Sequence, residues 1–214
     1  MKKYIISIGL LVGAGAFITT TTQSCSVLAT TDVGMSVIKS LLNRGIDKAS
    51  AIYSNEKEFL SNNQIDKALP SQLRKINDIL NKVSPDLVKK EKIYIAKAAA
   101  YTVKTSTPIL KNTVNNLTKA DVARITQGGK GTLTQVLKEK AYQQVVSAIV
   151  PKVDEKLNQF GIVKTINTAL RGNQNNPATG GISKLASEQI ATGLFNIIEK
   201  YEKDNKNSIL GLKL

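Results

Sequence analysis

Lysine recurs at a spacing that could build an anion-binding surface in the middle of the chain. Lys90, Lys97, Lys104 and Lys111 follow one another every seven residues, and Lys119 comes eight residues later. Seven residues drift by only about 20° on a straight helix, so these side chains are expected on one face. A row of ammonium groups attracts anionic surfaces.

Two tyrosines, Tyr94 and Tyr101, repeat at the same interval on the adjoining edge. We interpret the seven residues as a docking face for lipid headgroups, an acidic glycan or an acidic partner protein. Near a membrane each lysine could contribute about 1 kcal/mol. The alternative interpretation is a solvated face with tyrosines packed at its rim, because exposed lysine on a helix is ordinary.

Composition narrows the possible chemistry. The chain has 214 residues, a net charge of +14, one cysteine, and neither histidine nor tryptophan. Without imidazole, zinc and haem sites and catalytic triads are disfavoured. We therefore expect a binding protein without metal or cofactor, and no catalytic residue. An enzyme using Tyr101, Asp121 or Arg124 in a cleft is the weakest alternative, since no motif unites them.

The first residues predict export. Lys2 and Lys3 precede an apolar stretch from Tyr4 to Ile18, and small polar residues then lead to Cys25. This order is typical of a signal peptide, and the apolar stretch is too short to span a bilayer. Removing it lowers the net charge to +12, of which +8 lies between Lys89 and Lys140.

Ser24-Cys25 resembles the end of a bacterial lipobox, although Thr22 and Gln23 depart from its strict pattern. We predict a signal peptide over residues 1–24, an acylated Cys25, and a tether over residues 25–31. Cleavage after Ala29 is the alternative and would discard the cysteine. Several acyl chains make a stable anchor, and no second long apolar segment follows.

The expected location is therefore the cell envelope, at the outer membrane facing the periplasm. The chain would be held there by its lipid anchor without spanning the membrane. Export disfavours nucleic acid as a partner.

Apolar periodicity of three to four residues predicts an all-α fold, a single-domain bundle of six to eight helices over residues 32–201. A long helix from Ser84 to Leu117, with a kink near Pro108, is expected at its centre. The other predicted helices span 32–53, 71–83, 118–127, 132–160, 162–170 and 182–201. Residues 54–69 and 171–181 are interpreted as loops, and 202–214 as a C-terminal tail.

Several short motifs occur in the order seen in the domain-of-unknown-function 4197 family of exported, all-helical bacterial proteins. The segments that resemble it are Ala68-Leu69-Pro70, Ala96 to Thr107, Leu117 to Asp121, Gly128-Gly129 and Ala148 to Pro151. Two features depart from the family pattern: Ala100-Tyr101 stand where an acidic residue is usual, and the C-terminal arm is shorter. The family has no assigned activity, so the resemblance implies fold and compartment and no catalytic residue.

The sequence thus favours a membrane-anchored envelope lipoprotein that acts as a non-catalytic binding or structural module, with a basic helix face for an anionic partner. A periplasmic carrier that encloses an apolar, lipid-like ligand within its helical bundle is the alternative.

Overall fold

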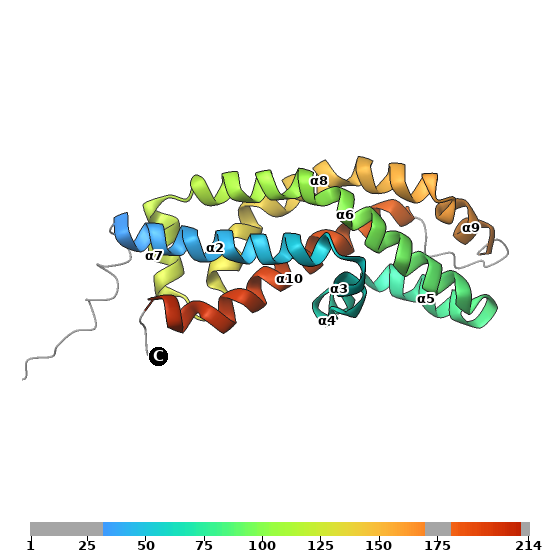
Figure 1. The fold of residues 1–214 in the computed structure, drawn as a ribbon, viewed down its shortest axis with the longest axis horizontal. Coiled ribbons are helices and arrows are strands. Elements are labelled where there is room, and N and C mark those ends of the chain that lie inside the picture. Colours follow the sequence, from blue (N-terminus) through green and yellow to red (C-terminus); the bar gives the residue numbers. More distant parts are fainter. Residues whose placement is uncertain (1–31, 170–180, 211–214) are drawn as a thin grey trace, which may run out of the picture.

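Nine helices and no strand make up the described part of the chain, residues 32–169 and 181–210 of a computed structural model. The all-α class is confirmed (Figure 1). The helices are α2 (Asp32–Tyr53), α3 (Glu56–Ser61), α4 (Asn63–Lys67), α5 (Ser71–Val83), α6 (Pro85–Asn115), α7 (Lys119–Gln127), α8 (Thr132–Gln159), α9 (Ile162–Ala169) and α10 (Ile182–Leu210).

Two short helices replace the loop expected over residues 54–69. The Asn55 side chain accepts a hydrogen bond from the Glu58 N–H and begins α3, and Asn62 does the same for α4 through the Gln64 N–H. Asparagine is among the preferred helix N-caps because its side-chain oxygen satisfies an unpaired backbone donor. The polar residues that indicated a loop are therefore helix caps.

The long helix α6 is continuous through Pro108, and it bends along its length (Figure 1). Proline removes one backbone hydrogen bond and crowds the carbonyl four residues earlier. Within the two turns before Pro108, the Thr102 hydroxyl donates to the Ala99 carbonyl and the Ser106 hydroxyl to the Thr102 carbonyl. Such side-chain bonds back to the helix also favour bending.

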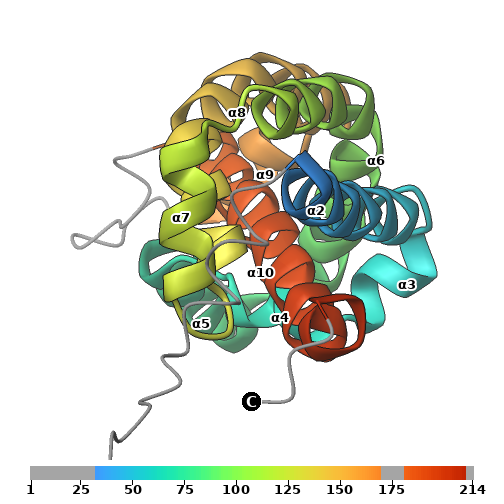
Figure 2. The same cartoon turned by 90° about the vertical axis from the view of Figure 1, so that its left-hand side faces the viewer.

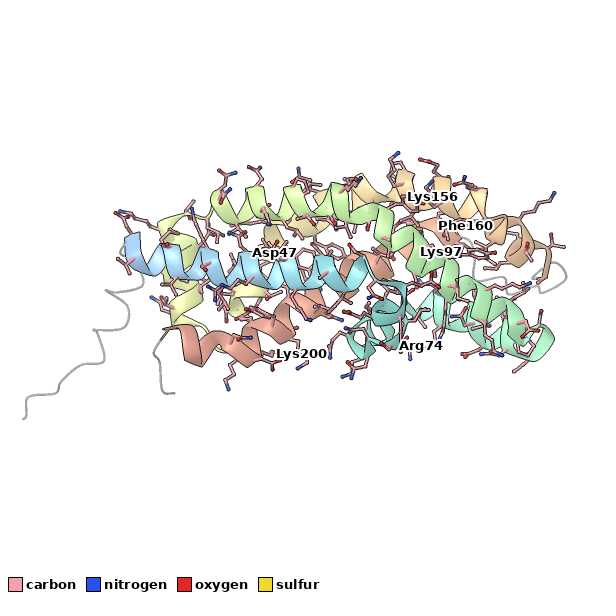
Figure 3. All side chains as sticks on the ribbon, in the orientation of Figure 1. Asp47, Arg74, Lys97, Lys156, Phe160 and Lys200 are labelled. Atoms are coloured by element: carbon pink, nitrogen blue, oxygen red, sulfur yellow. The ribbon has the colours of Figure 1, made fainter. Side chains whose placement is uncertain are left out.

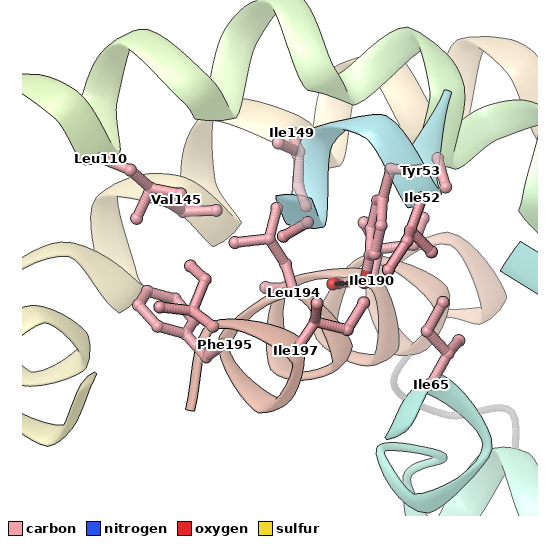
Figure 4. Packing of buried hydrophobic residues seen from close by; sticks show 14 of the residues in the cluster. Ile52, Tyr53, Ile65, Leu110, Val145, Ile149, Ile190, Leu194, Phe195 and Ile197 are labelled. Carbon is pink, nitrogen blue, oxygen red and sulfur yellow. Dashed lines mark hydrogen bonds between the residues drawn. The ribbon is translucent and has the colours of Figure 1, made fainter. Parts of the chain in front are cut away.

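Among the residues whose burial is described, those of α10, the last described helix, are the most buried. Figure 2 shows it passing between α2, α6 and α8 on one side and α4 and α5 on the other, and its contacts with α2, α8 and α4 are extensive. Side chains from α2, α4, α6 and α8 converge on it (Figure 4). Its inner surface comprises Ile182, Leu185, Ala186, Ile190, Ala191, Leu194, Phe195, Ile197 and Ile198.

A buried tyrosine joins the first described helix to the last. The Tyr53 hydroxyl donates a 2.5 Å hydrogen bond to the Ile190 carbonyl (Figure 4). A Cβ atom at Gly193 would lie 2.8 Å from that hydroxyl oxygen and 3.3 Å from the Ile65 Cα. Glycine is needed at this position because only hydrogen leaves room for α2 and α4 to approach α10.

The N-terminus of α8 is capped by a residue from α10. Glu202, 1% exposed, accepts hydrogen bonds from the backbone N–H groups of Gly131, Leu133 and Thr134 and from the Thr134 hydroxyl, at 2.8–3.1 Å. Gly131, at φ +96°, has no side chain to cap the helix. Glu202 therefore satisfies orphan donors and lies at the positive end of the α8 dipole.

Helix α10 continues to Leu210, whereas the sequence predicted its end near Tyr201 and a tail from residue 202. The polar character of that stretch hid a carboxylate that is buried against α8. The signal peptide, the tether with Cys25, and loop residues 171–180 lie outside the described residues. None of the described helices is long and apolar enough to cross a bilayer.

We predict that Glu202→Ala lowers the free energy of unfolding by about 3 kcal/mol, because it leaves buried N–H groups without an acceptor. Urea unfolding followed by circular dichroism measures this loss. The matched control is Asp204→Asn, which removes one exposed ion pair with Lys200 on the same helix and should cost less than about 0.5 kcal/mol. Equal losses in the two variants would contradict the capping role.

Candidate functional site

Three of the five predicted lysines share an outward face of α6. Lys90, Lys97 and Lys104 are exposed, and they lie opposite the buried residues Ile95 and Thr102 on a helix of 3.6 residues per turn. Among the described residues none of the three lysines makes an ion pair. We call Lys90, Lys97 and Lys104 the lysine face.

The neighbours of α6 define the edges of this face. On one side α6 packs against α2, where the Ser50 and Thr107 hydroxyls are 2.8 Å apart. On the other side it packs against α8, the most extensive helix pair in the fold. The lysine face therefore lies on the exposed strip of α6 between its contacts with α2 and with α8.

The other two lysines are placed differently. Lys111 is half-buried and its ammonium lies 2.7 Å from the Asp47 carboxylate of α2. Lys119 is exposed but begins α7, a separate helix after α6 ends at Asn115. The eight-residue step to Lys119 spans the helix boundary that the sequence predicted between residues 117 and 118, so Lys119 does not share the face of α6.

The two predicted tyrosines pack toward α8. The Tyr94 ring stacks on Phe160 at 4.7 Å, and the Lys97 ammonium lies 5.7 Å from the Tyr94 ring centre. Tyr101 is 54% exposed, and the Lys156 ammonium of α8 lies 4.3 Å from its ring centre. Figure 3 shows Lys97, Lys156 and Phe160 in the same part of the molecule.

The tyrosines therefore bring α8 into the same region. A cation–π contact holds an ammonium group beside an aromatic ring, and at an exposed site it contributes about 0.5–1 kcal/mol of stabilisation. Lys156 belongs to this region, and sequence spacing within α6 could not identify it because it comes from another helix.

A second polar site, which the sequence analysis missed, lies at the opposite side of α6. Glu91 is 1% exposed, and it lines a cavity of about 30 Å³ together with Asn77 of α5 and Gln189 of α10. The sequence did indicate that Glu91 is buried, because it falls three residues after Val88 and four before Ile95, on the apolar side of α6.

The oxygens of this cavity have no donor among the described residues. Both Glu91 carboxylate oxygens, Asn77 Oδ1 and Gln189 Oε1 are buried without a hydrogen bond. Burial raises the pKa of the Glu91 carboxyl from 4.5 to about 7, and the nearby Asn77 amide and Lys92 ammonium offset part of this rise. The Asn77 amide is close enough to act on the pKa, yet it makes no hydrogen bond of ordinary geometry to Glu91.

The residues considered for an enzyme each engage a different partner. Asp121 forms a capping box with Thr118 and lies 3.1 Å from the Lys140 ammonium, whereas Arg124 makes a two-pronged contact with Glu139. The ring of Tyr101, on α6, contacts the ammonium group of Lys156, on α8. Within the described residues no group of three histidine, cysteine or acidic side chains could hold a metal ion.

Comparison with known proteins gives one match. The family model described as "Protein of unknown function (DUF4197)" matches residues 28–210. No curated protein and no solved structure matches the chain.

We predict that the buried carboxyl makes stability fall as pH rises. Below pH 4.5 the Glu91 carboxyl is protonated in both the folded and the unfolded chain, so its burial lowers the free energy of unfolding little. Between about 4.5 and 7 the unfolded chain ionises first, so the free energy of unfolding falls, by about 3 kcal/mol in total. Glu91→Gln should remove this fall, measured by urea unfolding at pH 5, 6, 7 and 8.

Exposed Glu56, at the start of α3, provides the control. Glu56→Gln should retain the pH dependence of the wild type, because its carboxyl faces water. If Glu91→Gln and the wild type lose equal stability between pH 5 and pH 8, the Glu91 carboxyl is not buried in this way.

Proposed function

Since the chain belongs to the DUF4197 family, for which no function is assigned, we propose a function from its own surface. The protein is a membrane-anchored lipoprotein of the cell envelope. It acts as a non-catalytic binding module whose lysine face docks on anionic lipid headgroups.

The proposal rests on the uncompensated charge of Lys90, Lys97 and Lys104. The Lys111 ammonium is paired with the Asp47 carboxylate, whereas these three ammonium groups make no ion pair with a described residue and remain available to an anion. At about 1 kcal/mol each near an anionic membrane, they would contribute about 3 kcal/mol. Such a contribution suits a second signal beside an acyl anchor, since stable attachment usually takes two.

The position of the predicted anchor would allow the lysine face to lie against the membrane. The Lys39 ammonium, near the start of α2, donates a 2.6 Å hydrogen bond to the Asn115 carbonyl at the end of α6. The tether would therefore leave the body at the same end as Lys111. Seven extended residues reach about 25 Å, and α6 is about 46 Å long. The molecule could then lie with α6 along the membrane and Cys25 anchored at one end.

A carrier of an apolar ligand is the alternative proposal. It would use a groove of about 350 Å³ between α2, α3, α4 and α10, within the usual range for ligand pockets. Ile52, Ile197 and Tyr201 line this groove, but so do Lys48, Glu58, Lys200 and Asp204. These charges favour a solvated groove over an apolar chamber. Co-purified lipid detected by native mass spectrometry would favour the carrier.

Charge reversal tests the lysine face. In a Cys25→Ala background, which removes any acyl contribution, Lys97→Glu with Lys104→Glu should weaken binding to phosphatidylglycerol vesicles by at least roughly 30-fold. Vesicle co-sedimentation at low and high salt measures the effect, and wild-type binding should fall with salt.

The control carries the same change of charge on another surface. Lys67→Glu with Lys75→Glu alters exposed lysines of α4 and α5 that make no ion pair with a described residue. If both pairs weaken binding equally, only net charge matters and the lysine face is not a docking site. Retained binding of the Lys97/Lys104 variant to vesicles would equally exclude it.

We predict that Cys25 carries the anchor. Cells grown with a tagged fatty acid should label the wild-type protein and not the Cys25→Ala variant, and the labelled protein should sediment with membranes. Intact-mass analysis of purified protein checks the same point independently. A chain that starts at Thr30 without an acyl adduct would disprove the anchor.

A further inference from the structure

The cavity beneath α6 combines features that the docking function does not use. Its buried polar side chains come from three helices: Glu91 from α6, Asn77 from α5 and Gln189 from α10, each at least 93% buried. Phe59, Leu60, Ile65, Leu69 and Ile95 form its apolar walls. Apolar walls around a few convergent polar groups are typical of a small-molecule site.

Four oxygen atoms in this cavity need donors. Glu91 contributes two oxygens, and Asn77 and Gln189 contribute one each, all buried and without a hydrogen bond among the described residues. Buried polar atoms are nearly always satisfied, and a buried carboxylate requires a positive partner or a proton. A ligand that fits must therefore supply several donors and, when Glu91 is ionised, a positive charge.

We propose that this cavity binds a primary ammonium group, with Glu91 as its counter-ion and Asn77 and Gln189 as its further acceptors. An ammonium group of this kind has three N–H donors and no acceptor, which matches three oxygen-bearing side chains. The ligand class is a small primary amine.

The size of the cavity agrees with this class. A cavity needs about 10–15 Å³ to hold one water-sized group. This cavity, at about 30 Å³, therefore accommodates two such groups, for example the nitrogen and the carbon of methylammonium. A divalent metal ion fits less well. Calcium prefers six to eight oxygen ligands and magnesium an octahedral shell, whereas the buried, unpaired oxygens of this cavity come from one carboxylate and two amides.

The proton competes with the ligand for Glu91. The charged groups that line the cavity are Asp66 of α4, which favours a cation, and Lys92 of α6, which opposes it; α3, α5 and α10 contribute no titratable group. Because the carboxyl titrates at about pH 7, ammonium binding should strengthen from pH 5.5 to pH 8 as the proton leaves.

Methylammonium chloride is the probe for this site. At pH 8 and constant ionic strength, replacing potassium chloride by methylammonium chloride should raise the urea midpoint of the wild-type protein in a saturable manner. The folding equilibrium constant should rise about tenfold at ten times the dissociation constant. Tetramethylammonium, which has the charge but no N–H donor, should have no such effect, and at pH 5.5 the methylammonium effect should be small.

Two variants locate the effect. Glu91→Gln should abolish the response to methylammonium, and Gln189→Met, which keeps the side-chain length without the acceptor, should weaken it. Glu56→Gln, on exposed α3 surface, should respond as the wild type does. A response that persists in Glu91→Gln, or an equal response to tetramethylammonium or to potassium, would overturn the proposal. So would the lack of any response in the wild type at pH 8, which would indicate a cavity that takes only water.

Discussion

The fold depends on the burial of α10, the last helix of the described chain. Its apolar residues pack against α8 and against α2 and α4, which lie much earlier in the chain, and its polar atoms complete groups that those helices leave unsatisfied. The Ile190 carbonyl accepts from Tyr53, Glu202 caps α8, and the Asn196 side chain donates to the Gln64 carbonyl. Each of these contacts joins distant segments, so the tertiary structure requires the C-terminal part of the chain.

This arrangement leaves α6 with two different polar sides. Toward the core it presents Glu91 to a cavity closed by α10, and toward solvent it presents the lysine face between α2 and α8. A helix of 31 residues packed along two neighbours keeps a free strip on its outer side. The same helix can therefore contribute to an external docking surface and to an internal site, and the two are tested by separate variants.

Much of the local structure could be predicted from the sequence because it depends on near neighbours. Helix starts at Asp32, near Ser84 and near Thr118 were predicted within a residue, and the signals that set two of them are local: proline in the first turn of α6, and the capping box of Thr118 and Asp121 at the start of α7. The two helices between residues 54 and 69 were missed because asparagine signals both turns and caps, and only tertiary packing of Phe59 and Ile65 decides between them.

The sites were less predictable, for a physical reason. Lysine spacing identified three exposed residues on one helix correctly, but ion pairing of Lys111 with Asp47 and the contact of Lys156 with Tyr101 depend on other helices. Glu91 and Glu202 are two acids among sixteen, and nothing near them in the chain indicates that their partners lie on α5, α8 and α10. Long-range partners of this kind emerge only from the assembled bundle.

Native-state hydrogen exchange tests the central role of α10 most directly. Amides from Ile190 to Ile198 and those of Leu133 and Thr134 in the first turn of α8 should exchange only through global unfolding, with the same free energy of opening. If α10 instead opens at lower free energy while α2, α6 and α8 stay protected, it is a peripheral helix and the account of this fold is wrong.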